Sequence, residues 1–206
     1  MPTVVTISAP YGTGGSVVGP QLAERLGVPF LDRAIPVEVS RRLDIPLDEA
    51  LSQEELPRDA LSRWMASFAP AVQLFGGAPL AHTPPQDDEA FCAATEAVLR
   101  DAAEAGAVIL GRAGAIVLRD VPGALHVRLD ARRERRLEQA MRMGGFDREQ
   151  AERELRASDV AREAYVRTWY RADPANPSHY HLVIDSTRID LARCVELIAT
   201  AARKPE

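Results

Sequence analysis

The feature that most constrains this chain is a glycine-rich turn near its N-terminus. Residues 4–7 are β-branched and mostly apolar, which predicts a buried strand. The turn reads Tyr-Gly-Thr-Gly-Gly-Ser over residues 11–16. Apolar residues then recur at helical spacing over residues 17–26, and Gly27 ends the run. A strand, turn and helix in this order bring unpaired backbone N–H groups and the positive end of a helix dipole together, which favours phosphate binding.

The turn nearly matches the phosphate-loop pattern G-x-x-x-x-G-K-[ST]. Aligned on the final glycine and hydroxyl residue, the window covers residues 9–16, and Gly14 and Ser16 fit the pattern. Ala9 replaces the first glycine, and Gly15 stands where the lysine is expected. Because that lysine normally supplies a charge to the outer phosphates, two interpretations stay open. The turn is a phosphate-binding loop, or it is a glycine-rich turn that binds no ligand.

The composition favours a single globular domain. A chain of 206 residues with 46% hydrophobic residues suits one domain with an ordinary core. There is no long apolar run and no secretory signal at the N-terminus, so we expect a cytoplasmic protein that does not bind membranes. Cys92 and Cys194 are expected to be small buried hydrophobic residues. The net charge of −5 argues against general nucleic-acid binding.

The positive charges are almost all arginines and are concentrated in one region. Lys204 is the one lysine among 25 basic residues, and twelve of the 24 arginines fall between Arg128 and Arg171. Arginine binds phosphate in a bidentate manner, so this region is a candidate phosphate-binding segment. The same region carries nine acidic residues, and it therefore also fits helices covered with salt bridges.

The order of the predicted elements indicates an α/β fold. Strands are expected near residues 4–7, 28–31, 107–110, 125–129 and 181–185, and helices include 89–105, 132–143, 147–170 and 191–203. Alternation of strands and helices predicts a parallel sheet covered on both faces. Ligands of such sheets lie beyond the carboxyl ends of the strands. The glycine-rich turn and three polar positions follow strands in this way: Asp32-Arg33, Gly111-Arg112 and Asp130.

Each of these polar residues has a functional and an ordinary interpretation. Arg112 suits an acceptor phosphate, or it is a surface arginine in a turn. Asp32 suits a sugar hydroxyl or a base amine, or it caps the following helix, and Asp130 is expected to cap its own helix. Asp159 and Arg162 lie three residues apart on one helix, which also fits a common ion pair.

Five segments carry a more specific joint pattern. They read YGTGG at 11–15, LGVPFLDRAI at 26–35, VILGRAGAIVL at 108–118, SDVAREAYVRTWY at 158–170 and NPSHYHLVIDST at 176–187. In this order they resemble the cytidylate kinase-like family, a branch of the nucleoside monophosphate kinases with a P-loop fold. The resemblance covers nearly the whole chain, and the Y-G-S-G-G loop of that branch also lacks the usual lysine.

The resemblance implies an architecture and an activity. It implies one three-layer P-loop kinase domain over residues 1–206, with a five-stranded parallel sheet, an acceptor-binding helical insertion over 34–88 and arginine-rich lid helices over 131–171. It also implies ATP with Mg²⁺ as phosphate donor and a nucleoside monophosphate such as CMP or dCMP as acceptor. By analogy, donor phosphates would bind at Gly12, Thr13, Gly14, Gly15 and Ser16 (with Ser16 at the metal), the acceptor at Asp32, Arg33 and Arg112, and the transferring phosphate at Arg162, Arg156 and Asp159.

The chain also departs from the family pattern. The family usually has Arg-Gln before its Tyr-Gly pair and Arg-Glu after the loop, where this chain has Ala9-Pro10 and Ser16-Val17. The loop thus has no positive charge of its own, and a lid arginine has to supply one. Two alternatives stay open: a sensor or partner protein that binds nucleotide without transferring phosphate, and a kinase of another hydroxylated small molecule. The apolar positions between Trp64 and Phe75 fit a core or a homodimer face.

Overall fold

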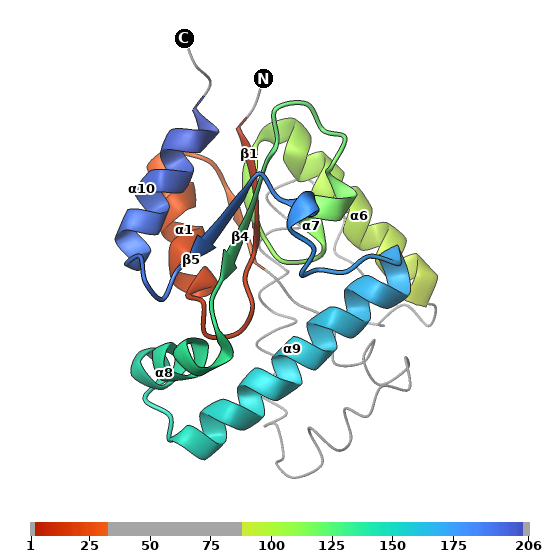
Figure 1. The fold of residues 1–206 in the computed structure, drawn as a ribbon. Helices are drawn as coiled ribbons and strands as arrows, with labels where there is room; N and C mark the ends of the chain where they lie inside the picture. The colour runs from red at the N-terminus through yellow and green to blue at the C-terminus, as the bar shows by residue number, and fades with distance from the viewer. Residues whose placement is uncertain (1–2, 33–87, 204–206) are drawn as a thin grey trace.

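The computed structural model describes residues 3–32 and 88–203 of the chain (Figure 1). Arg33, the segment from Trp64 to Phe75 and almost all of the predicted insertion at 34–88 therefore lie outside the described residues. The described elements, in chain order, are β1 (Val4–Ser8), α1 (Gly15–Leu26), β2 (Phe30–Leu31), α6 (Asp88–Ala105), β3 (Ala107–Leu110), α7 (Gly114–Val117), β4 (Leu125–Asp130), α8 (Arg133–Gly144), α9 (Arg148–Tyr170), the 3₁₀ turn η1 (Pro177–His179), β5 (Leu182–Asp185) and α10 (Leu191–Ala202).

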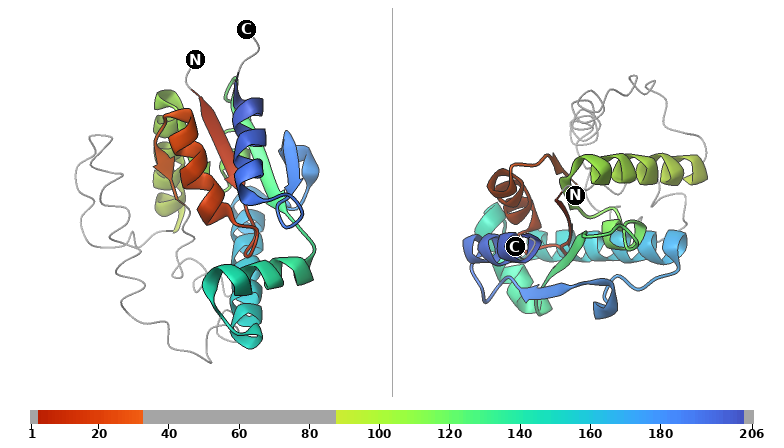
Figure 2. Two further views of the ribbon diagram at one scale, coloured as in Figure 1. Left: turned by 90° about the vertical axis from the view of Figure 1, so that its left-hand side faces the viewer. Right: turned by 90° about the horizontal axis from the view of Figure 1, so that it is seen from above.

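The five strands form one parallel sheet in the order β2-β3-β1-β4-β5. Helices α1 and α10 cover one face, while α6 and α7 lie on the other (Figure 2). This arrangement confirms the predicted α/β class with a five-stranded parallel sheet. Strand β1 is the central strand, with β3 on one side of it and β4 on the other. Ligands of open parallel sheets bind at such a point, where the strand order reverses.

The burial of β1 explains why its sequence is so uniformly β-branched. Val5 and Ile7 pack into the cluster beneath α1 and α10, together with Leu22 and Ile198. Val4 points to the other face and packs with the cluster formed by β3 and α6. A strand buried on both faces has no solvent-facing side, so its residues are mostly apolar rather than alternating, and the buried Thr6 hydroxyl finds a partner in His126.

The charged region after β4 forms two helices at the carboxyl ends of the strands (Figure 1). Helix α8 is followed by the long helix α9, whose N-cap is Asp147, with Oδ1 accepting a hydrogen bond from the Gln150 amide at 2.8 Å. These helices match the predicted pair at 132–143 and 147–170. They place a long arginine-bearing element directly below the glycine-rich turn.

The prediction that Asp130 caps the helix after β4 is wrong. The strand continues through Asp130, which pairs in register with Asp185 of β5. The N-cap of α8 is Arg132, which makes no side-chain cap hydrogen bond. The Asp130 carboxylate instead accepts from Arg128 Nε at 3.0 Å and from its neighbour's amide, Ala131, at 2.9 Å. The buried arginine two residues earlier therefore determines where this carboxylate lies.

Two other expectations concern membranes and cysteines. Among the helices that the structure describes, none has the length and apolarity to cross a membrane. Cys194 is fully buried in the cluster beneath α10, as predicted. Burial, with a further contribution from Asp190, raises the pKa of its thiol to about 11, so the thiol stays protonated and unreactive at neutral pH.

Candidate functional site

The glycine-rich turn between β1 and α1 is held closed by Thr13. Its amide and its hydroxyl both donate to the carbonyl oxygen of Pro10, at 3.2 and 2.7 Å. The Thr13 carbonyl in turn accepts from Ser186 Oγ, after β5, at 2.8 Å. Thr13 is fully buried by these contacts. Of the predicted phosphate-binding residues, Thr13 thus uses its polar groups to shape the loop.

The glycines and Ser16 form the outer part of the loop. Gly12 and Gly14 have φ angles of 79° and 77°, in the left-handed region that glycine tolerates best. A Cβ atom on Gly12 would lie 2.2 Å from the carbonyl oxygen of Arg136, so the loop packs against the backbone of α8. Ser16 is exposed in the first turn of α1, where amide groups have no partner within the helix. This end of α1 is therefore suited to an anion.

Gly15, at the lysine position of the phosphate-loop pattern, has no room for a side chain. A Cβ atom there would lie 2.4 Å from Ala9 Cβ and 3.1 Å from Leu110 Cδ1. Ala9 is itself buried and stands where the pattern has its first glycine. The two departures from the pattern are therefore coupled, because the methyl group of Ala9 occupies the space next to Gly15.

A pocket beside the loop brings two predicted arginines together. It is lined by Arg112, which follows β3, by Arg162 of α9, and by Ser8 and Tyr165. Burial lowers the pKa of the Arg112 guanidinium, and Tyr165 and the carboxylate of Asp32 partly oppose that shift. An arginine nevertheless stays charged at neutral pH, so the pocket presents fixed positive charge. Asp32, Arg112 and Arg162 thus meet at the carboxyl edge of the sheet, as their positions after strands predict for the first two.

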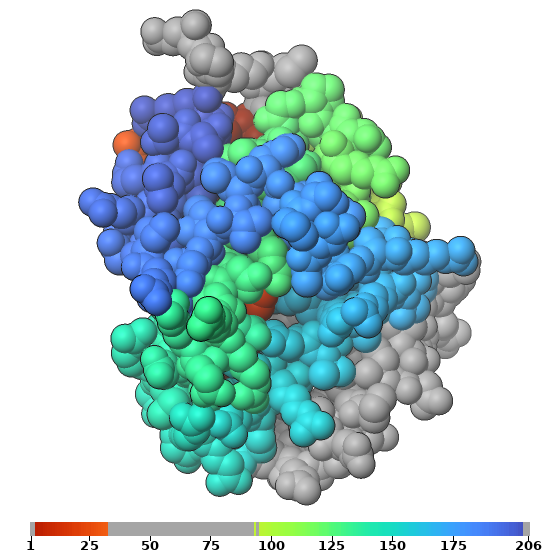
Figure 3. Space-filling model, viewed as in Figure 1, coloured from red at the N-terminus to blue at the C-terminus, as the bar shows by residue number. Residues whose placement is uncertain are grey.

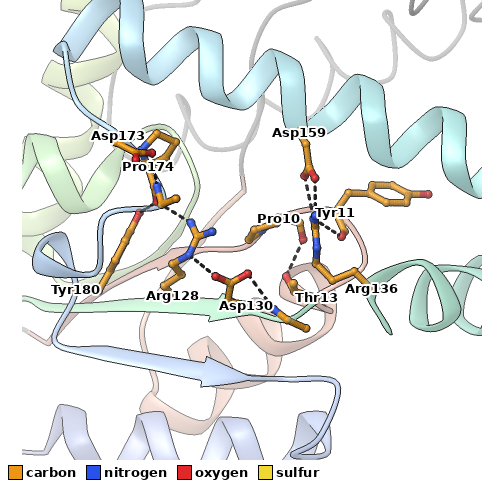
Figure 4. Close-up of polar contacts among 12 residues, drawn as sticks. Pro10, Tyr11, Thr13, Arg128, Asp130, Arg136, Asp159, Asp173, Pro174 and Tyr180 are labelled. Atoms are coloured by element: carbon orange, nitrogen blue, oxygen red, sulfur yellow. Dashed lines mark hydrogen bonds and ion pairs between the residues drawn. The ribbon is translucent and has the colours of Figure 1, made fainter. Parts of the chain in front are cut away.

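Two arginines of α8 and α9, the predicted lid helices, contact the loop directly. Arg162 Nη2 donates to the carbonyl oxygen of Ala9. Arg136 of α8 makes a bidentate pair with Asp159 of α9, at 3.0 and 2.6 Å, and its Nη1 also donates to the Tyr11 carbonyl at 3.2 Å (Figure 4). Asp159 therefore pairs with an arginine of the neighbouring helix, while Arg162, three residues further along α9, reaches the loop.

The remaining predicted lid arginine lies apart from these contacts. Arg156 is exposed on α9 and makes no hydrogen bond or ion pair with the part of the chain that the structure describes. Sequence reasoning did not single out Arg136, because it is one of twelve arginines in its region and nothing in its immediate neighbours marks it. Its role depends on how α8 packs on the loop.

A second buried arginine fixes the segment after α9. Arg128 of β4 is 7% exposed, donates to the Pro174 carbonyl at 2.6 Å, and lies 5.8 Å from the ring centroid of Tyr180 (Figure 4). The Tyr180 hydroxyl donates to the same carbonyl at 2.8 Å. Pro174 and Tyr180 are walls of the pocket that holds Arg112 and Arg162. Arg128, which the sequence did not reveal as a site residue, therefore positions two residues of the pocket wall without lining the pocket itself.

A further hollow lies between the loop and α8. It has a volume of about 210 Å³ and is lined by loop residues, including Gly14, Gly15 and Ser16, and by Met143 and Phe146 at the end of α8. In Figure 3, part of the N-terminal segment is visible in red at the bottom of the depression between α8 and α9. The start of α1 thus forms part of the wall of this hollow.

A magnesium ion that arrived with a nucleotide would need few protein ligands at this site. Within residues 3–32 and 88–203, no group of three or more His, Cys, Asp or Glu side chains is placed to hold a metal. Magnesium in nucleotide sites is held mostly by phosphate and water oxygens, with one or two protein oxygens. The exposed hydroxyl of Ser16, at the start of α1, is suited to be such an oxygen.

Comparison with known proteins identifies the family. The family model described as "Cytidylate kinase-like family" matches residues 4–188. The chain belongs to the cytidylate kinase-like family. The resemblance indicated by its five sequence segments is thereby confirmed, and the matched span includes the loop, α8, α9 and β5. Family membership gives the protein a kinase-like character but leaves the acceptor open.

One of three similar solved structures supports the fold. A crystal structure of an uncharacterized protein from Eubacterium ventriosum superposes with a TM-score of 0.61 at 17% identity, covering 97% of this chain and 98% of that one. A shikimate kinase from Acinetobacter baumannii in complex with shikimate gives a TM-score of 0.46 at 18% identity, with 99% and 97% covered. A gluconokinase from Sinorhizobium meliloti gives 0.44 at 16%, with 98% of each covered. The first of these shows a shared fold, and the two weaker similarities carry no argument.

One curated protein matches part of the sequence. A uronate isomerase from Corynebacterium glutamicum is 34% identical over 105 residues, which are 50% of this chain and 20% of that protein. The chain thus spans about a fifth of the length of the curated relative that it matches. A match of this extent does not transfer an activity to this member of the cytidylate kinase-like family.

Proposed function

We propose that this protein is a kinase that transfers the γ-phosphate of ATP to a small acceptor, with a nucleoside monophosphate such as CMP or dCMP as the first candidate. Membership of the cytidylate kinase-like family supports phosphotransferase chemistry. The observation that carries the proposal is that Arg112 and Arg162, from two distant segments, line one pocket at the end of β1, and that Arg162 also contacts the start of the loop at Ala9. Phosphoryl transfer requires mainly positioning and positive charge, and this arrangement supplies both.

Each part of the site has a role in this proposal. The amides and dipole of the loop and α1 hold the donor phosphates, and Arg112 binds the acceptor beside Asp32. Arg162, which contacts the loop at Ala9, stabilises the charge of the phosphate in transfer. A bound magnesium ion, next to Ser16, would neutralise part of the donor's charge. Arg33 and Arg156 stay sequence predictions for the acceptor and the transferring phosphate.

A second candidate function is nucleotide binding without phosphate transfer. Two observations favour it over a simple kinase. The lysine position has no space for a side chain, because Ala9 fills it. The Arg136 charge that lies on the loop is already paired with Asp159. A protein that binds ATP but lacks an uncompensated charge at the outer phosphates would serve as a sensor or a partner.

An assay with variants tests the kinase proposal. Purified protein is given ATP, magnesium and a panel of nucleoside monophosphates and unphosphorylated hydroxylated acceptors, and ADP release is measured. We expect turnover with at least one acceptor, and a loss of kcat/KM of roughly 100-fold or more in Arg112→Ala and Arg162→Ala. The matched control is Arg148→Ala, because Arg148 is an exposed lid arginine that pairs with Glu134 and Glu152 away from the loop.

The outcomes separate the two candidates. Turnover that depends on Arg112 and Arg162 but not on Arg148 supports the kinase. ATP binding, seen as a thermal shift, without turnover on any acceptor supports the nucleotide-binding alternative. Absence of both binding and turnover contradicts both.

A further inference from the structure

Arg136 is the buried charged residue closest to the loop that the proposed roles do not use. It is 8% exposed, lies in the first turn of α8, and its carbonyl oxygen packs against Gly12 so closely that no Cβ atom would fit there. Its guanidinium reaches the Tyr11 carbonyl on one side and Asp159 on the other (Figure 4). This one side chain therefore joins the loop, α8 and α9.

The guanidinium of Arg136 has donor capacity left over. It makes three hydrogen bonds, two to Asp159 and one to Tyr11, out of the five N–H groups that an arginine carries. Its Nε atom is buried and has no hydrogen-bond partner among the described residues. A buried donor without an acceptor costs free energy, and such groups are rare unless a ligand or water satisfies them. The spare donor belongs to a residue in direct contact with a loop that lacks its lysine.

Asp159 determines how much of the Arg136 charge a ligand feels. The pair is short and partly shielded from water, with side-chain exposures of 10% for Arg136 and 30% for Asp159. In this arrangement the two charges largely cancel. A polyphosphate carries more negative charge than one carboxylate and matches the fork of N–H donors, so it competes with Asp159 for the same guanidinium.

We propose that Arg136 binds the phosphates of the nucleotide donor in place of the missing loop lysine, and that Asp159 restrains this charge as a positioning residue. The inference rests on the proposed function only in requiring that the loop binds a polyphosphate. It predicts that the two partners of this ion pair have opposite effects on the affinity for polyphosphate. Loss of Arg136 weakens polyphosphate binding, whereas loss of the Asp159 charge strengthens it.

Calorimetric titration of the full chain with inorganic pyrophosphate, at low ionic strength, tests this opposition. We expect Arg136→Gln to weaken pyrophosphate binding at least tenfold, and Arg136→Lys to recover part of the loss because it restores the charge without the fork. We expect Asp159→Asn to tighten binding about threefold or more. The matched controls are Arg148→Gln and Glu149→Gln, which change the same charges in exposed lid pairs and should shift affinity less than twofold.

The double variant Arg136→Gln with Asp159→Asn guards against misfolding, because it leaves no unpaired buried charge. It should fold, as judged by circular dichroism, and bind pyrophosphate as weakly as Arg136→Gln. If Asp159→Asn weakens binding as much as Arg136→Gln does, the pair is a structural brace and the proposal is wrong. Wild-type protein that does not bind pyrophosphate, or Arg136→Gln that binds normally, overturns it equally. Pyrophosphate binding with this pattern but no phosphate transfer to any acceptor leaves the inference standing and contradicts the kinase instead.

Discussion

Residue 15 is glycine because of a residue six positions earlier. The methyl group of Ala9 and the side chain of Leu110 fill the space where a side chain of residue 15 would begin. Both departures from the phosphate-loop pattern are visible in the sequence, but their contact depends on how the turn closes. The pattern alone therefore suggests that the first glycine and the lysine were lost independently. In the structure, the alanine at position 9 and the glycine at position 15 depend on each other.

This coupling predicts a non-additive pair of substitutions. Gly15→Ala should lower the free energy of unfolding by about 1–3 kcal/mol, because its methyl group would overlap with that of Ala9. Ala9→Gly removes the overlapping methyl group, so the double variant should recover much of that loss. Urea unfolding of the four proteins in a double-mutant cycle measures the coupling. Ser16→Ala, at the next and exposed position, is the control, and purely additive effects of Ala9 and Gly15 would refute the coupling.

The arginines show the limit of sequence reasoning at this scale. Arg112 and Arg162 were predicted as site residues, the first because it follows a strand and the second from the family motif, and the structure brings both to one pocket. Arg128 and Arg136 were not, although both are buried and shape the site. One arginine among twelve in this region has no local signal of burial, since only the packing of β4 for Arg128 and of α8 for Arg136 distinguishes these two.

At the scale of elements, α9 positions two of the predicted site residues. It carries Asp159 and Arg162 on 23 residues and begins at Asp147, whose carboxylate caps the first turn. The sequence predicts this helix well because two glycines end the preceding helix and Asp147 follows them. Asp130 was misjudged because a residue that suits a helix cap also suits the end of a strand, and pairing with β5 decided between them.

The cap of α9 gives a prediction for the element as a whole. Asp147→Ala should lower the free energy of unfolding by about 1 kcal/mol, because the amide of Gln150 loses its acceptor. Asp147→Asn retains an acceptor oxygen and should cost clearly less. Urea unfolding measures the stability, and hydrogen exchange should show faster exchange confined to the first turn of α9. Equal stability of all three proteins would show that the cap does not stabilise the helix.

At the scale of the molecule, a buried histidine in the sheet makes the stability of the folded protein depend on pH. His126 of β4 is 3% exposed, lies 2.8 Å from Thr6 Oγ1 of β1 through Nδ1, and stacks on His181 with ring centroids 5.0 Å apart. Burial, and then the nearby His181, lower the pKa of His126 to about 4. The folded protein therefore keeps this ring neutral at pH values where the unfolded chain binds a proton.

The sign of the resulting pH dependence follows from proton uptake. Between pH 6.5 and about 4 the unfolded state binds a proton at His126 that the folded state does not, so stability falls as the pH falls through this window. The loss should reach up to about 3 kcal/mol and level off below pH 4. Urea unfolding at pH 7.5, 6, 5 and 4.5 measures it. His126→Gln should flatten the curve, whereas His179→Gln, in the surface turn η1, should leave it unchanged, and an unaltered curve for His126→Gln would refute the assignment.

The order of the strands also governs how this chain can be synthesised. The central strand is synthesised before the other four described strands, yet Val4 pairs with Ala107 and Val5 with Leu125. At elongation rates of roughly 5–20 residues per second, β1 waits on the order of 5–20 seconds for either neighbour. During that time its apolar residues have no strand to pair with, and non-local pairing of this kind is slow and prone to aggregation. Of the described strands, the one that leads into the glycine-rich turn thus waits longest during translation for a partner strand.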